Sequence, residues 1–139
     1  MRFSASIPLL LLLIASGSDD TEARLCVGGR TNEQHFAGSQ AVFLGRARGQ
    51  QVLQGAAGRA ETETTFEIDR QWKGEPRPTI AVRTCGAPGE WCEHKVSFEP
   101  GQAYVVFASG TPLRTSACSL TSTAEAGIPV VTWLEQRAF

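Results

Sequence analysis

Four cysteines and two histidines are the residues of this sequence whose side chains could do chemistry. Cys85 and Cys92 are separated by six residues, and His94 follows closely, so thiolate and imidazole ligands for zinc lie near one another in the chain. Structural zinc sites, however, use four ligands and cysteine pairs with only two to four residues between them. We therefore expect these cysteines to form disulfides, and we expect no bound metal and no cofactor.

Catalytic motifs are missing from the sequence. His35 and His94 are its only histidines, and no Gly-x-Ser-x-Gly segment occurs that would present a serine nucleophile to either of them. There is also no Cys-x-x-Cys redox motif and no glycine-rich phosphate loop. The sequence predicts no catalytic residues and a protein that is not an enzyme.

The first residues resemble a secretory signal peptide. Arg2 is followed by an apolar run over residues 7–15, which is about half of the roughly 20 residues that a membrane-spanning helix needs. Cleavage after Ala23 would leave Arg24 as the first mature residue, and small residues up to Gly17 offer an earlier site. We expect residues 1–23 to be removed and the protein to be secreted, or periplasmic in a bacterium, without membrane attachment. A buried N-terminal helix and a retained anchor are the less favoured alternatives.

The thiols of a secreted chain are usually oxidised to disulfides. Four cysteines allow three pairings. Cys85 and Cys92 flank a turn-forming hexapeptide that contains two glycines and a proline, so they can bond to each other. Cys26 with Cys118 would then close nearly the whole mature chain and tie its N-terminus down. We favour this pairing over Cys26–Cys92 with Cys85–Cys118.

Length and charge set the class of protein. The chain has 139 residues, which allow one domain, and we expect a single domain over residues 24–139. Its net charge of −1 gives no positive field for a phosphate backbone, so we expect no nucleic acid partner. We expect a monomer.

The segments that position these residues are predicted to be mainly strands. Residues 31–38 predict a short helix, residues 41–47 a buried strand, and residues 49–59 a mobile polar loop. Residues 62–72 form the clearest strand, with Phe66, Ile68 and Trp72 on one face, which Arg70 interrupts. The acidic side chains of Glu67 and Asp69 then belong to a solvated face.

Further strands are predicted over residues 79–84, 103–108 and 113–118, and a helix over residues 124–134. Residues 103–108 are apolar on both faces, as in a central strand. Five or six strands in succession, without helices between them, favour an antiparallel barrel or sandwich.

The order of these segments resembles the tissue inhibitor of metalloproteinases family within the netrin-like modules, in its small bacterial-type form. The resemblance covers residues 26–134 and implies a five-stranded, antiparallel barrel of the oligonucleotide/oligosaccharide-binding (OB) type with short flanking helices. It rests on the early Cys26 and on Ala41-Val42-Phe43-Leu44-Gly45, Thr65-Phe66-Glu67-Ile68, Trp72-Lys73-Gly74, Val82-Arg83-Thr84, Cys92, Phe98, Gly101, Tyr104-Val105-Val106-Phe107-Ala108 and Thr115-Ser116-Ala117-Cys118-Ser119.

Inhibitors of this family chelate the zinc of a metalloproteinase through a mature N-terminal cysteine. Cys26-Val27 matches the second cysteine of the family's Cys-x-Cys-Val start, so Arg24 takes the chelating position and Leu25 the position that enters a protease pocket. The segment with Glu90 and Trp91 matches the one beside the N-terminus. The resemblance therefore implies a zinc metalloproteinase as partner, with contacts from Arg24, Leu25, Cys26, Val27, Glu90 and Trp91.

This chain has one N-terminal cysteine where inhibitory relatives have two. A netrin-like module that binds a protein or a glycan without inhibiting a protease is therefore the alternative. Trp91 is either an exposed anchor or a cover over the Cys85–Cys92 bridge. We expect Trp72 and Trp133 to lie in the core.

Overall fold

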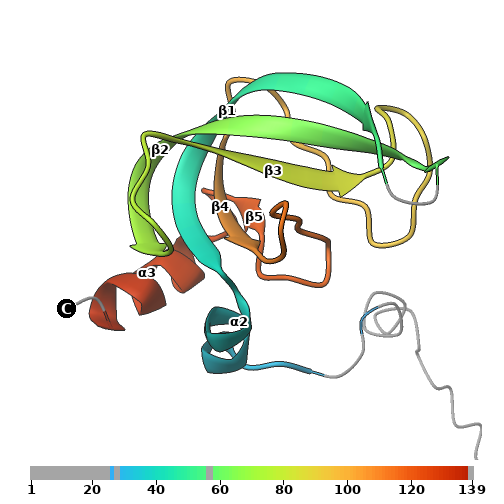
Figure 1. The fold of residues 1–139 in the computed structure, drawn as a ribbon. Coiled ribbons are helices and arrows are strands. Elements are labelled where there is room, and N and C mark those ends of the chain that lie inside the picture. The colour runs from blue at the N-terminus through green and yellow to red at the C-terminus, as the bar shows by residue number, and fades with distance from the viewer. Residues whose placement is uncertain (1–25, 27–28, 56–57, 138–139) are drawn as a thin grey trace, which may run out of the picture.

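The computed structural model describes residues 26, 29–55 and 58–137. The expected signal peptide, and the predicted contact residues Arg24, Leu25 and Val27, lie outside the described residues. The chain forms one strongly bent sheet with two short helices near one end (Figure 1). Its elements are α2 (Asn32–Gly38), β1 (Ala41–Gln54), β2 (Ala60–Lys73), β3 (Thr79–Cys85), β4 (Ala103–Ala108), β5 (Ser122–Thr123) and α3 (Ile128–Arg137).

The sheet has the strand order β3-β2-β1-β4-β5, and every neighbouring pair of strands is antiparallel. The ladder is not closed into a full barrel. Arg114 bridges the gap, because it pairs with Arg83 of β3 on one side and with Ser109, directly after β4, on the other. The mainly-β, barrel-like fold with short flanking helices that the sequence predicts is confirmed.

Two apolar clusters lie on opposite faces of the sheet. The inner cluster is built around four aromatic rings in edge-to-face contact, those of Phe43, Phe66, Phe98 and Tyr104. In the outer cluster, side chains of β1 and β4 pack with residues of α3, among them the fully buried Leu134. Strand β4 contributes to both clusters, which explains why its sequence is apolar throughout.

The face predicted for Trp72 is wrong. Leu44 pairs with Arg70 whereas Gly45 pairs with Ile68, so one extra residue lies in β2 at this point. Such a bulge reverses the alternation of side chains. Phe66 and Ile68 therefore belong to the inner cluster, while Trp72 belongs to the outer one and Arg70 forms an ion pair with Glu135 of α3.

The polar loop predicted over residues 49–59 is too long, because β1 continues to Gln54 and β2 begins at Ala60, which leaves only residues 55–59 between the strands. The two strands form a long hairpin whose polar side chains bond across it, as the amide of Gln51 does to the carboxylate of Glu63 at 2.9 Å. The short helix is confirmed as α2, which begins with a capping box between Thr31 and Gln34.

The segment after β4 is not the strand predicted over residues 113–118. It is a series of turns in which hydroxyl groups donate hydrogen bonds to nearby backbone carbonyls, as Ser119 Oγ does to that of Ser116. Such local hydrogen bonds compete with those that would pair this segment with a neighbouring strand. The last helix begins at Ile128 rather than near Ala124, because the amides of Ala126 and Gly127 bond back to Thr123 in a turn. The two-residue strand β5 was not predicted.

Candidate functional site

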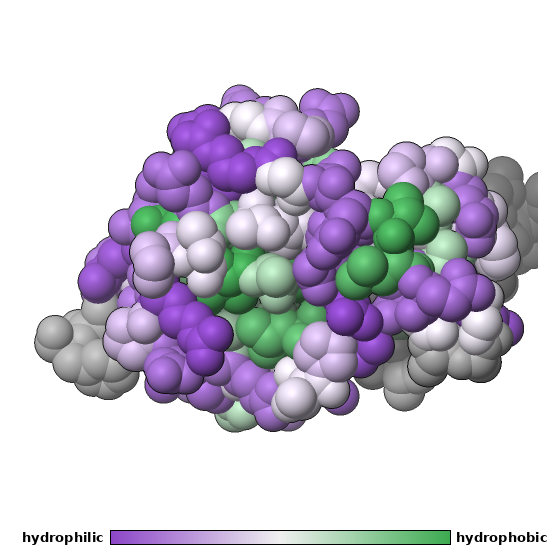
Figure 2. Space-filling model, turned by 45° about the horizontal axis from the view of Figure 1, so that its top comes forward, coloured by the Kyte–Doolittle hydropathy of each residue, from purple (hydrophilic) through white to green (hydrophobic). Residues whose placement is uncertain are grey.

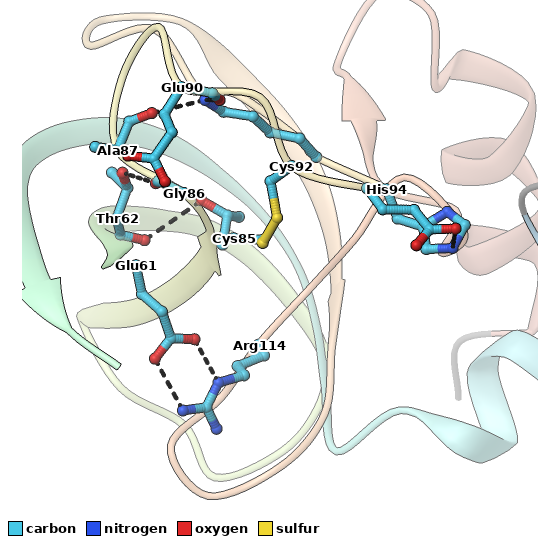
Figure 3. Close-up of a disulfide and its surroundings, with 12 residues drawn as sticks. Glu61, Thr62, Cys85, Gly86, Ala87, Glu90, Cys92, His94 and Arg114 are labelled. Carbon is cyan, nitrogen blue, oxygen red and sulfur yellow. Dashed lines mark hydrogen bonds and ion pairs between the residues drawn. A yellow bond between two sulfur atoms is a disulfide. The ribbon is translucent and has the colours of Figure 1, made fainter. Parts of the chain in front are cut away.

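The connection after β3 forms a braced loop, here called the Trp91 loop (residues 86–95). The disulfide Cys85–Cys92 closes the loop around residues 86–91. Lys95 Nζ donates to the carbonyl of Ala87 at 2.7 Å and to that of Glu90, so one ammonium group constrains the tip of the loop. The Oγ1 of Thr62 donates to the carbonyl of Gly86 at 2.7 Å and fixes the base of the loop to β2 (Figure 3).

Trp91 projects from this loop into solvent. Its exposed fraction is 85%, against 53% for Val52 and 60% for Ile128, the other exposed large apolar residues among those described. The reading in which Trp91 covers the Cys85–Cys92 bridge is therefore wrong. A rigid, exposed tryptophan is a typical anchor of protein and ligand contacts.

A groove of about 670 Å³, here called the Trp91 groove, runs along the loop. It brings together three of the predicted contact residues, Cys26, Glu90 and Trp91, although Cys26 is far from the other two in the chain. Cys26 is held there by its disulfide to Cys118, with a Cα–Cα distance of 5.2 Å. The structure thus has the disulfide pairing that the sequence favoured. The remaining lining residues are Gly89, Cys92, Glu93, His94, Lys95, Ser97 and Ala117.

His94 lines the Trp91 groove and lies beside the Cys26–Cys118 disulfide. Its Nδ1 lies 3.2 Å from Sγ of Cys118, and its Nε2 lies 3.5 Å from a carboxylate oxygen of Glu93. Among the described residues, Cys26, His94 and Cys118 are the one group of three whose possible ligand atoms lie within 4.8 Å of one another. Spacing along the chain associates His94 with Cys85 and Cys92, but the fold places it with the other pair.

A second groove, of about 490 Å³, is lined by both cysteines of the same disulfide. It is lined by cationic side chains from separate segments, including Arg30, Arg83 and Arg114, together with Glu61. Hydrogen bonds from Arg114 are the main cause that lowers the pKa of Glu61, and the nearby charge of Arg83 adds to the effect. Burial, assisted by the charge of Arg30, lowers the pKa of His35 in the same groove. No motif in the sequence indicated this cluster, because its members come from separate segments of the chain.

The remaining predictions concern the sheet surface. Trp72 and Trp133 are half-buried in the outer cluster, as expected of core residues. Glu67 and Asp69 are exposed, and Glu67 forms an ion pair with Arg48 at 2.9 Å, as expected of a solvated face. Polar residues cover most of the face in Figure 2, with apolar residues gathered in two separate areas.

Comparisons with known proteins leave the family open. No protein-family model matches the chain, and no curated protein matches it. Two disulfides agree with an oxidising, extracellular environment. Among the described residues, no helix has the length and apolar character needed to cross a membrane.

Proposed function

We propose that the protein is a secreted inhibitor of a zinc endopeptidase, which it contacts through the Trp91 groove and the mature N-terminus. One observation carries this proposal: Cys26, Glu90 and the exposed Trp91 line a single groove. The resemblance to metalloproteinase inhibitors assigns the contact to these same positions, on the basis of sequence order alone. Sequence position and spatial proximity therefore favour the same surface.

The groove is lined by Cys26, which would be the third residue of a chain cleaved after Ala23. Two residues of fully extended chain span at most about 7 Å. After cleavage behind Ala23, the α-amine of Arg24 would be a free donor for the protease zinc, and it would displace the water that the metal activates. Leu25 would then enter a protease pocket, and Trp91 would anchor the contact beside it.

The test compares two forms of the mature protein against a panel of zinc endopeptidases. The form that begins at Arg24 is expected to inhibit at least one of them at stoichiometric concentration. The form that begins at Ser18 carries six further residues, which block the amine, and is expected not to inhibit. N-terminal sequencing of the secreted protein shows which form occurs. A natural N-terminus at Ser18, together with no inhibition by the Arg24 form, contradicts the proposal.

The second candidate is a module that binds a protein or a glycan without inhibiting a protease. It is favoured by the bond between Cys92 and Cys85, because that cysteine cannot then brace the first mature residue. An unbraced terminus loses about 1–2 kcal/mol of conformational entropy per residue when it is ordered on binding. Capture of a non-protease partner that is unaffected by removal of Arg24 and Leu25 would favour this candidate.

A further inference from the structure

We propose that Cys26, Cys118 and His94 form a zinc site when the disulfide between the two cysteines is reduced. The three residues come from separate parts of the chain: the N-terminal segment, the turns after β4 and the Trp91 loop. Their ligand atoms nevertheless lie within 4.8 Å of one another. This inference does not depend on protease inhibition.

The distances suit tetrahedral zinc. With Zn–S bonds of about 2.3 Å and Zn–N bonds of about 2.0–2.1 Å, tetrahedral angles require a nitrogen–sulfur distance of about 3.5 Å and a sulfur–sulfur distance of about 3.8 Å. The imidazole Nδ1 of His94 already lies 3.2 Å from Sγ of Cys118. The Cα atoms of Cys26 and Cys118 are 5.2 Å apart, so side-chain rotation can separate the two sulfurs once their bond is broken.

Glu93 is placed to orient the imidazole for this role, because its carboxylate lies 3.5 Å from Nε2 of His94. In the disulfide form the sulfur of Cys118 can only accept a hydrogen bond, so the 3.2 Å contact with Nδ1 suits an imidazole that carries its proton on Nδ1. When the sulfur becomes a thiolate and a metal binds, the proton moves to Nε2, on the side of Glu93, and the lone pair of Nδ1 becomes a ligand. Histidine ligands of zinc commonly donate their second N–H to a carboxylate, and such a partner strengthens metal binding.

Three protein ligands leave the fourth position of the metal open. Cys26 and His94 both line the Trp91 groove, so this position faces a solvent-accessible space of about 670 Å³. Water or a small anion can complete the coordination there. Three ligands with an open position are typical of exchangeable or catalytic zinc rather than of a closed structural site.

The redox step is a thiol–disulfide exchange with a low-molecular-weight thiol. Two molecules of the thiol, RSH, become one RSSR and supply two electrons and two protons. The bond between Cys26 and Cys118 breaks, and each sulfur takes one electron and one proton. Zinc binding then converts both thiols to thiolates and releases the two protons to solvent.

Cobalt(II) titration of the full mature chain tests the site, since tetrahedral thiolate coordination gives cobalt strong visible and near-ultraviolet absorption. The chain is reduced with a phosphine, because a thiol reductant would itself supply thiolate ligands for cobalt. One cobalt per chain is expected, displaced by zinc, whereas the oxidised protein is expected to bind none. Equal binding by the oxidised and reduced forms would overturn the proposal.

Variants separate this site from the other cysteine pair. The double variant Cys26→Ser/Cys118→Ser is expected to lose the absorption, and Cys85→Ser/Cys92→Ser is expected to keep it. Glu93→Gln is expected to weaken zinc binding by about 10-fold to 100-fold, and His94→Gln by more. These last two variants retain both disulfides and can be checked for folding before reduction. Unchanged affinity in His94→Gln, or a reduced protein that unfolds and does not recover with metal, contradicts the proposal.

Discussion

Arg114 holds Glu61 in a two-point ion pair: Nε lies 2.7 Å from one carboxylate oxygen and Nη2 lies 3.0 Å from the other. Glu61 also lies 3.6 Å from the guanidinium of Arg83. Its side chain retains only 13% of its exposure. One carboxylate therefore links β2 to β3 and to the turn segment at the place where the sheet is not closed by a strand.

We expect Glu61→Gln to lower the free energy of unfolding at pH 7 by about 1 kcal/mol, a modest value because Arg114 is partly exposed. The pKa of Glu61 is lower in the folded protein than its ordinary value of 4.5. Its contribution is thus complete above that value and is lost as the pH falls through the folded pKa. Thermal unfolding of both proteins between pH 7 and pH 2 should show the difference shrinking below about pH 4.5.

The matched control is Glu75→Gln. Glu75 pairs with Arg77 at 3.0 Å, but both side chains are more than 60% exposed, so the substitution is expected to leave stability nearly unchanged. A stability difference between Glu61→Gln and the natural protein that stays constant from pH 7 to pH 2 would show that ionisation of Glu61 does not stabilise the fold.

The two disulfides should contribute unequally to stability. Cys26 and Cys118 are 92 positions apart in the sequence, and Cys85 and Cys92 are 7 apart. The loss of chain entropy in the unfolded state then gives about 4.7 kcal/mol for the first and about 2.5 kcal/mol for the second. We expect the Cys26→Ser/Cys118→Ser variant to be less stable than Cys85→Ser/Cys92→Ser by about 2 kcal/mol in urea unfolding. The reverse order would place the main constraint in the Trp91 loop.

Trp91→Ala should separate function from stability. Because the side chain is 85% exposed, the free energy of unfolding is expected to change by no more than about 0.5 kcal/mol. Loss of a central anchor costs about 2 kcal/mol of binding, so affinity for the proposed protease partner should fall about 30-fold. Inhibition constants and thermal unfolding measure the two effects.

Val52→Ala is the control for Trp91→Ala. Val52 is exposed on the β1–β2 hairpin and does not line the Trp91 groove. This variant should inhibit as well as the natural protein. If Trp91→Ala and Val52→Ala inhibit equally, the Trp91 groove is not the contact surface.

Local patterns in the sequence were enough to predict most elements of the fold. The alternation of apolar and polar residues around Phe66 indicated β2, the apolar run over residues 103–108 indicated β4, and the helix-capping residues indicated α2. Patterns failed where non-local pairing decides the structure. The polar end of β1 is a strand because β2 pairs with it, and Trp72 faces α3 because of a bulge that depends on the register between two strands.

The site was predictable only in part for the same reason. Glu90 and Trp91 were predicted from the resemblance to the inhibitor family, and the structure adds that they line one groove with Cys26. The proximity of His94 to Cys118 could not be found, because 24 positions separate them and no spacing rule connects them. The carboxylate of Glu61 likewise meets Arg114 across 53 positions.

Gly127 should be required for the packing of α3 against the sheet. A Cβ at this buried position would lie 2.6 Å from a methyl carbon of Val105 and 2.8 Å from the Oγ of Ser122. Val105 is fully buried in the outer cluster, so it has little room to move. We therefore expect Gly127→Ala to cost about 1–3 kcal/mol in urea unfolding through overpacking. Gly49→Ala is the control, because a Cβ there meets nothing within 4 Å, and it should be neutral or stabilising by up to about 1 kcal/mol. Equal stabilities for the two variants would mean that α3 adjusts its position on β4 without cost.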